Sequence, residues 1–169
     1  MSDEKQSPVD QFIERLSKLE AGERAKLKRN AGNSLSQSRR VHALFFQLLP
    51  YGIPRPHEAW YFLVATLYPL AEPGSKDTLG DALRRARNNH PEREKGFDRR
   101  FEVLLDADPD QVPFRMRQIV RLLSAAETPV NWSLLLQDLI RWNHPNRYIQ
   151  EKWARAYYTG QDLKSLPGK

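Results

Sequence analysis

The stretch His57–Leu70, HEAWYFLVATLYPL, decides the fold of this chain. Between Trp60 and Leu67, every position except Thr66 carries an apolar or aromatic side chain. A helix without a polar face is typical of the centre of a protein, where other elements pack on all sides of it. The run is also shorter than the roughly 18 apolar residues that a membrane span needs. It predicts a buried central helix over residues 57–70.

The segments around this helix repeat their apolar residues at the three-to-four spacing of amphipathic helices. Period-two runs and the Asn-Gly or Asp-Gly signals of hairpins are absent from the sequence. The pattern therefore predicts an all-α fold, with about eight or nine helices in two small helical bundles packed together. The segments with this apolar spacing, each an apolar stripe along one face of a helix, are Phe12–Leu19, Val41–Leu49, Leu79–Ala86, Phe97–Leu105, Phe114–Leu123, Leu135–Trp142 and Tyr148–Tyr157.

Capping residues mark where several of these helices begin. Ser7 precedes Pro8, which suits the first turn of a helix. Thr78 and Asn131 precede two further stripes, and Asp108, with the proline after it, is expected to cap the helix between them. Gly22 is expected to break the chain before a short basic helix over residues 23–30.

The segment Asn88–Pro91, NNHP, is the expected boundary between two halves, because a residue before proline disfavours helix. We expect an N-terminal helical subdomain over residues 1–88 and a C-terminal helical subdomain over residues 89–158. Residues 159–169 are expected to form a flexible tail.

Composition narrows the class of protein. The 169 residues include 27 lysines and arginines against 21 aspartates and glutamates, and no cysteine. The lack of thiols excludes disulfide scaffolds, thiolate zinc sites and cysteine nucleophiles. The start, MSDEKQSPVDQF, lacks the basic-then-apolar order of a signal peptide, so we expect a soluble cytoplasmic protein without membrane contact. The positive balance favours a polyanion or an acidic protein surface as partner.

Much of the positive charge lies in one acid-free stretch. From Arg24 to His57 the sequence contains seven lysines and arginines and no aspartate or glutamate. Arg24 and Lys28 lie four residues apart, as do Arg117 and Arg121. Like charges at this spacing destabilise a helix by roughly 0.2–0.5 kcal/mol, so several such pairs together favour a shared anionic ligand.

Catalytic and metal-binding patterns are absent from the sequence. The four histidines are far apart, and none belongs to a metal-spaced pair. Asp106, Asp108 and Asp110 mimic the start of a calcium-binding loop. The match fails because Gln111 and Arg117 stand where that loop needs glycine and glutamate. The sequence predicts a protein that is not an enzyme and uses no metal, cofactor or small-molecule substrate.

Two tryptophans next to basic residues suggest base stacking at first sight. Trp142 follows Arg141, and Trp153 follows Lys152. Both tryptophans, however, lie on the apolar stripes of their helices. We therefore expect both in the core rather than on a nucleic acid.

An ordered set of short segments gives the chain a family resemblance. Over about residues 9–158 it resembles the small subunit (CasB-type) of the type I-E CRISPR surveillance complex, Cascade. The segments that carry the resemblance are Ala25–Arg29, Leu49–Gly52 with Pro54–Arg55, Leu79–Leu83, Arg99–Leu105 with Ala107–Asp108, Met116–Leu123, Asn131–Trp132, Asp138–Trp142 and Trp153–Arg155.

The resemblance implies a protein without catalytic activity that works inside a larger assembly. In that family, two copies lie along the belly of the complex, against the repeated backbone subunits and the large subunit. They form a basic path that holds the displaced and target DNA strands of the R-loop, the DNA opened by guide pairing. The positions that match the family's basic residues are Lys28, Arg29, Arg55, Arg99, Arg121 and Arg147.

Two alternatives fit the same residues. A helix-turn-helix regulator would read duplex DNA with the helix Phe114–Leu123, whose Arg115, Arg117 and Gln118 are suitable base-reading side chains. A structural adaptor would turn its basic face to an acidic protein and make no contact with DNA.

Overall fold

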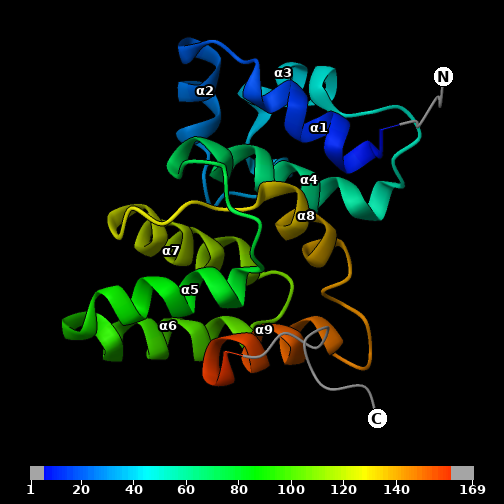
Figure 1. Cartoon of the computed structure of the whole chain (residues 1–169). Coiled ribbons are helices and arrows are strands. Elements are labelled where there is room, and N and C mark those ends of the chain that lie inside the picture. Colours follow the sequence, from blue (N-terminus) through cyan, green and yellow to red (C-terminus); the bar gives the residue numbers. More distant parts are fainter. Residues whose placement is uncertain (1–5, 161–169) are drawn as a thin grey trace, which may run out of the picture.

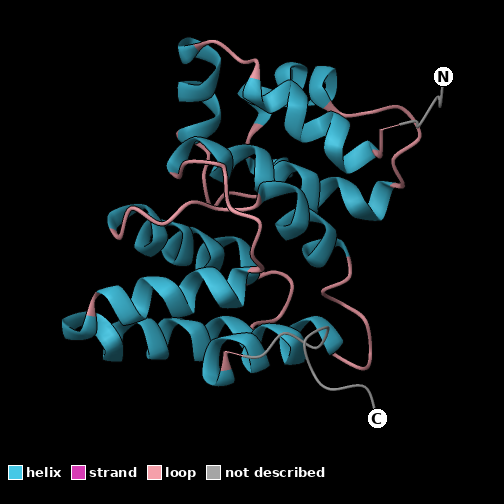
Figure 2. Ribbon diagram, in the orientation of Figure 1, coloured by secondary structure: helices cyan, strands magenta, loops and turns pink. Residues whose placement is uncertain are grey.

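The computed structural model describes residues 6–160, which form nine α-helices and four 3₁₀ turns (Figures 1 and 2). No strand occurs in this part of the chain, so the all-α prediction is confirmed. The tail predicted over residues 159–169 lies, after residue 160, outside the described residues. The elements are α1 (Pro8–Ser17), α2 (Ala21–Lys28), η1 (Leu35–Gln37), η2 (Arg39–Val41), α3 (His42–Leu48), α4 (Arg55–Leu67), η3 (Tyr68–Leu70), α5 (Leu79–Asn89), η4 (Pro91–Arg93), α6 (Glu94–Leu105), α7 (Val112–Ala125), α8 (Trp132–Ile140) and α9 (Tyr148–Thr159).

α4 is the buried central helix that the sequence predicted. Every residue from Trp60 to Leu67 is buried, and α2, α7 and α8 all pack against the helix. It begins at Arg55, two residues earlier than expected, because Pro56 fits the first turn, where no backbone donor is needed. No helix within residues 6–160 is both long and apolar enough to cross a bilayer.

The remaining helices pack across the middle of the sequence. α5 packs closely on α9 in the lower half of Figure 1, and α6 packs on α7. α8 contacts α1 as well as α4. Contacts therefore run across the boundary predicted between residues 88 and 89. The division into two subdomains, or into two bundles, stays a prediction.

Three of the predicted helix caps are confirmed. Ser7, Thr78 and Asn131 each accept a hydrogen bond from a backbone N–H in the first turn of the helix that follows, at 3.1, 3.3 and 3.1 Å. The cap predicted at Asp108 is wrong, because α7 begins at Val112. The Asp108 main-chain carbonyl instead accepts hydrogen bonds from the N–H groups of two later residues, which form a turn before the helix.

The break predicted at Gly22 is also wrong. Gly22 lies inside α2, which starts at Ala21. The reciprocal capping of Glu20 and Glu23, a capping box, starts the helix one residue before the glycine. The sequence pattern of Ser/Thr capping does not reveal this start, because a glutamate takes the capping role here.

The two tryptophans considered for stacking lie in the core, as predicted. Trp142 Nε1 donates to the Ala107 carbonyl at 3.3 Å, and Trp153 Nε1 donates to Asp138 Oδ2 at 2.8 Å. Lys152 Nζ lies 2.7 Å from the other oxygen of Asp138. The buried carboxylate is therefore paired and hydrogen-bonded, as a buried charge must be.

The α5–α9 crossing gives a stability prediction. A Cβ added at Gly80 would meet the main-chain carbonyl oxygen of Trp153, whereas a Cβ at Gly22 would meet nothing within 4 Å. Gly80→Ala should therefore lower the free energy of unfolding by about 1–3 kcal/mol, as overpacking does. Gly22→Ala, the matched control inside α2, should raise it by about 0.5–1 kcal/mol. Urea unfolding of both variants measures the difference, and equal stability would contradict this description of the crossing.

Candidate nucleic-acid interface

The ion pairs of the protein are unevenly distributed along the chain. They join Glu14 to Lys18, residues between 77 and 98, and residues between 138 and 155. Within residues 6–160, no ion pair involves a lysine or arginine from residue 24 to 76 or from residue 99 to 121. The lysines and arginines of the acid-free stretch therefore form no ion pair with the rest of the described chain either.

The first group of unpaired cations surrounds an open hollow of about 940 Å³ between the end of α2 and the turns η1 and η2. No carboxylate lines this hollow, which we call the α2 hollow. Side chains of one sign around a concave surface raise the local concentration of the opposite charge. Its charged lining residues are Lys26, Arg29, Arg39 and Arg40.

Local hydrogen bonds fix the turns that carry the last two of these arginines. The Gln37 side chain accepts from the Ser34 N–H at 3.1 Å, and Ser38 Oγ donates to the Ser34 carbonyl at 2.9 Å. His42 Nε2 lies 2.6 Å from the carbonyl oxygen of Leu35. These contacts hold two successive 3₁₀ turns against the start of α3, so that the arginines of η2 face the end of α2 across the hollow.

A second hollow, of about 490 Å³, lies between α6 and α7. We call it the α6–α7 hollow. Its charged lining residues are all cations, three from α6 and one from α7, and Gln118 of α7 adds a polar amide. Two of the α6 cations lie four residues apart, a spacing that destabilises a helix unless an anion relieves the repulsion. The four cations are Lys95, Arg99, Arg100 and Arg115.

α7 connects the surroundings of the two hollows. Arg115 points into the α6–α7 hollow. Arg117 packs instead against Gly32, in the loop after α2, with its Cδ 3.1 Å from the position of a Cβ there. Arg121 is exposed one helical turn beyond Arg117, on the same face of the helix. The loop after α2 therefore contacts α7, and α7 in turn packs on α6.

Lys28 faces a different depression, of about 530 Å³, between α2 and η3. Arg24 lies one turn before it, with its guanidinium carbon 5.9 Å from the ring centroid of Tyr68. Arg24 Nη2 also donates to the Ser17 carbonyl at 2.9 Å. Glu72 lines the same depression, so its charge is mixed. Lys28 therefore lines a depression of mixed charge and not the α2 hollow.

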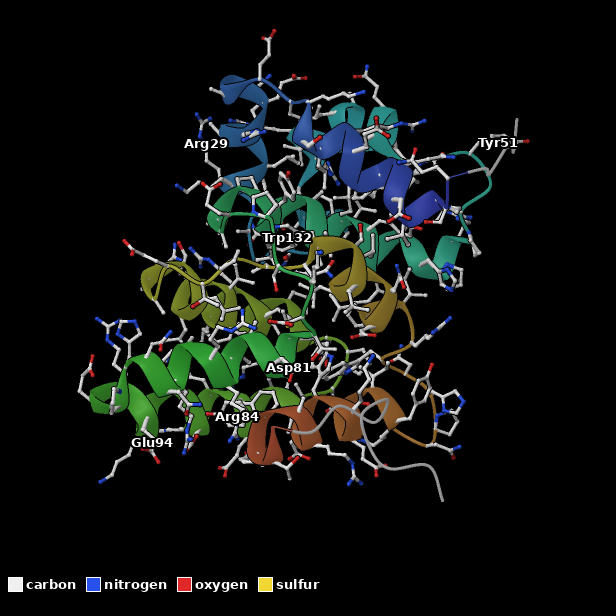
Figure 3. All side chains as sticks on the ribbon, in the orientation of Figure 1. Arg29, Tyr51, Asp81, Arg84, Glu94 and Trp132 are labelled. Atoms are coloured by element: carbon white, nitrogen blue, oxygen red, sulfur yellow. The ribbon has the colours of Figure 1, made fainter. Side chains whose placement is uncertain are left out.

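Arg55 lies far from Arg29, and Arg147 lies at the end of α6. Arg55 is exposed at the start of α4, just after the loop of Tyr51, which Figure 3 labels at the opposite end of the molecule from Arg29. Arg147 precedes α9 with a left-handed backbone, φ 50°, and its Nη2 donates to the Leu105 carbonyl at 2.5 Å. The structure thus places Lys28 and Arg29 at the end of α2, Arg121 on α7 and Arg99 on α6. It brings Arg147 to the end of α6 and leaves Arg55 at the start of α4.

Sequence reasoning missed several residues that line the hollows. Lys26, Arg39 and Arg40 lie in the acid-free stretch, which was the available signal for them. Lys95 and Arg100 flank Arg99 on one helix, and their like charges at short spacing were a weaker signal. No sequence signal joins them to Arg115, because only the packing of α6 on α7 brings that side chain to the hollow.

The packing of α7 disfavours the helix-turn-helix alternative. A recognition helix must be free to enter the major groove. α7 instead contacts α4, α5 and α6, and one of its three expected base-reading residues, Arg117, packs against Gly32.

Within the part of the chain that the structure describes, no three His, Asp or Glu side chains are grouped as metal ligands.

The comparison with protein families gives one clear match. The family model described as CRISPR-associated protein Cse2 matches residues 23–158. The chain is 40% identical over 98 residues to the CRISPR-associated protein Cse2 of Thermus thermophilus. That match covers 58% of this chain and 55% of the relative, so the chain spans little more than half of the relative's length in it.

Solved structures share the fold over most of the chain. A Cse2-family protein from Thermus thermophilus has a TM-score of 0.78 and 32% identity, covering 90% of this chain and 99% of its own. A chain from a structure described as a CRISPR RNA-guided surveillance complex has a TM-score of 0.75 and 23% identity. This second match covers 88% of this chain and 90% of that chain.

The contributions of two predicted arginines to the free energy of unfolding should differ, because their surroundings differ. Arg147→Gln removes the hydrogen bond to the Leu105 carbonyl and should lower the free energy of unfolding by about 0.5–1.5 kcal/mol. Arg99→Gln, the same change at an exposed arginine without an ion-pair partner among residues 6–160, should stay within about 0.5 kcal/mol of the parent protein. Urea unfolding tests both, and an unchanged Arg147 variant would mean that the contact contributes nothing.

Proposed function

The chain belongs to the Cse2 family of CRISPR-associated proteins, and from that premise we propose that it is a non-catalytic subunit of an RNA-guided DNA surveillance complex. Membership confirms the resemblance to the CasB-type small subunits. In this proposal the protein acts in the cytoplasm, during antiviral defence. It stabilises the R-loop by holding the displaced and target DNA strands against its basic surface.

The observation that carries the proposal is the pair of hollows lined by unpaired cations. The α2 hollow and the α6–α7 hollow each contain four lysines or arginines and no carboxylate. Phosphates repeat identically along every strand, so contacts to them are independent of base sequence. Such a surface suits a displaced strand, which has a different sequence in every target.

We propose that the strand follows the neighbouring elements α2, α7 and α6. The contacts would come from Lys28, Arg29, Arg121 and Arg99, together with the further cations that line the two hollows. Arg55 would meet another stretch of the opened DNA, since it lies far from Arg29. Arg147 would extend the surface at the end of α6. Arg147 has only part of its donor capacity free, because one nitrogen already holds the Leu105 carbonyl.

The mechanism follows from the energetics of strand exchange. Replacing a DNA duplex by an RNA–DNA hybrid is nearly balanced in free energy. Modest contacts to the separated strands are therefore enough to favour the open state. The protein needs no bond-making chemistry for this role. It only has to lower the free energy of single strands relative to the closed duplex.

The proposed partners are the other subunits of the complex, namely its repeated backbone subunits and its large subunit, and a second copy of this chain. A protein of the same fold occurs in a structure described as a CRISPR RNA-guided surveillance complex.

Affinity purification of the tagged protein from its native cell should recover a particle that contains guide RNA. Purification of the chain without any guide RNA would contradict this part of the proposal.

Binding of the isolated protein to single-stranded DNA should depend strongly on salt. Six phosphate contacts give a slope of about −4 in log K against log salt, hence a roughly 300-fold loss of affinity from 50 to 200 mM. Fluorescence anisotropy with labelled oligonucleotides of several sequences measures the affinity. Affinity that survives high salt, or a preference above about tenfold for one sequence, would show that phosphate contacts are not the basis of binding.

Charge reversal separates this function from that of a structural adaptor. Arg29→Glu combined with Arg99→Glu should leave the complex assembled but reduce its open DNA state, because each hollow loses a cation and gains a carboxylate. Arg93→Glu combined with Arg141→Glu, at two exposed arginines outside both hollows and outside the ion pairs, is the matched control. Permanganate footprinting measures strand opening. If assembly fails while binding of DNA to the isolated variant is unchanged, the adaptor reading is correct.

A further inference from the structure

Phe114 is an exposed aromatic residue at the edge of a cationic hollow. Its side chain, at the start of α7, is 51% exposed, whereas the tryptophans considered for stacking are buried in the core. The guanidinium carbon of Arg115 lies 5.3 Å from the centroid of the Phe114 ring. Arg115 also lines the α6–α7 hollow, so the phenyl ring contacts one of the residues that form the hollow.

An exposed phenyl ring has a cost that a ligand can remove. Apolar surface left in water forgoes roughly 25 cal/mol for each Å² that could be buried. The rest of α7 buries its apolar residues, including Met116 and Ile119, against neighbouring helices. Phe114 is the large apolar residue of this helix that stays half exposed. Its position beside Arg115, one of the four cations of the α6–α7 hollow, points to a ligand that is both flat and negatively charged.

Single-stranded nucleic acid combines these two properties. Bases stack on aromatic rings without regard to sequence, because every base has a π-face. The phosphates on either side of a stacked base would then lie within the α6–α7 hollow, where Arg99, Arg100 and Arg115 supply the opposite charge. An acidic protein segment fits less well, because the face of an aromatic ring is itself negative and gains nothing from a carboxylate.

We propose that Phe114 stacks on one base of a single strand whose flanking phosphates occupy the α6–α7 hollow. This inference rests on the proposed function, since it states how one of the two hollows takes the strand. The stacking contact adds affinity that salt does not screen. It also holds the strand at one point of the charged surface. A phosphate contact alone does not, because equivalent cations lie along that surface.

Phe46 offers a matched control. It is 49% exposed, on α3, and its ring lies 5.2 Å from that of Phe45. Phe46 lines neither the α2 hollow nor the α6–α7 hollow. Removing it deletes the same chemical group at nearly the same exposure, without touching the cations that border Phe114.

The experiment compares oligothymidine with an abasic strand of the same length, by fluorescence anisotropy over a range of salt concentrations. The parent protein should bind oligothymidine about 5- to 150-fold more tightly than the abasic strand. Phe114→Ala should lose most of this preference and keep the slope of log K against log salt. Phe114→Tyr should retain the preference, and Phe46→Ala should behave like the parent protein.

The salt slope identifies the kind of contact that is lost. Arg115→Gln, which removes a cation from the same hollow, should reduce the slope by about 0.7, the share of one phosphate contact on a single strand. If Phe114→Ala is unstable, Phe114→Leu serves in its place, because leucine is apolar but has no π-face.

Three results would overturn the inference. One is an unchanged preference for bases in both Phe114→Ala and Phe114→Leu. Another is an equal loss of affinity for oligothymidine and the abasic strand. The third is competition by polyglutamate as effective as that by unlabelled oligothymidine, which would make an acidic protein the ligand of the hollow. Failure of the proposed function looks different, because the parent protein would then bind neither strand even at low salt.

Discussion

From Trp60 to Leu67, α4 has no polar face, and the packing of the other helices follows from the need to bury this part on every side. Eight consecutive residues, Trp60–Leu67, are removed from water. Burying each large apolar side chain stabilises the fold by about 1.5–3 kcal/mol. α2, α7 and α8 come from distant parts of the sequence to cover this one helix. Because α2 and α7 both contact α4 and η3, cations that are far apart in the chain become neighbours on the surface.

The charged side chains fall into two groups, those in ion pairs and those without a partner of opposite charge in the described chain. Where α5, α6 and α9 meet, charges are paired: Arg87 contacts Asp98 at 2.9 Å, and Tyr157 donates a hydrogen bond to the same carboxylate. Burial and this hydrogen bond raise the pKa of Tyr157 above its ordinary value, so its hydroxyl stays neutral. Around the two hollows the cations lack such partners within the described chain and repel one another. That repulsion lowers stability, and a bound polyanion relieves it.

The sequence predicts most features that depend on local chemistry, although the cap at Asp108 and the break at Gly22 were wrong, and it does not predict where distant residues meet. The central helix and the caps Ser7, Thr78 and Asn131 follow from neighbouring residues, so they were predictable. The turns that aim Arg39 and Arg40 into the α2 hollow depend on serine and histidine contacts that no periodicity reveals. The same holds for Arg147, whose link to the Leu105 carbonyl spans 42 residues. The basic residues were thus predictable as a group, but their grouping into hollows was not.

The central claim is that the cations around the α2 and α6–α7 hollows form the surface that holds single-stranded DNA. Photo-crosslinking of the protein to an oligonucleotide containing iodouracil, followed by mass spectrometry of the peptides, tests it most directly. We expect adducts within residues 26–40 and 95–121, which carry the lining residues of both hollows and Arg121. Adducts confined to α1, α8 or α9, with these two segments unmodified, would contradict it.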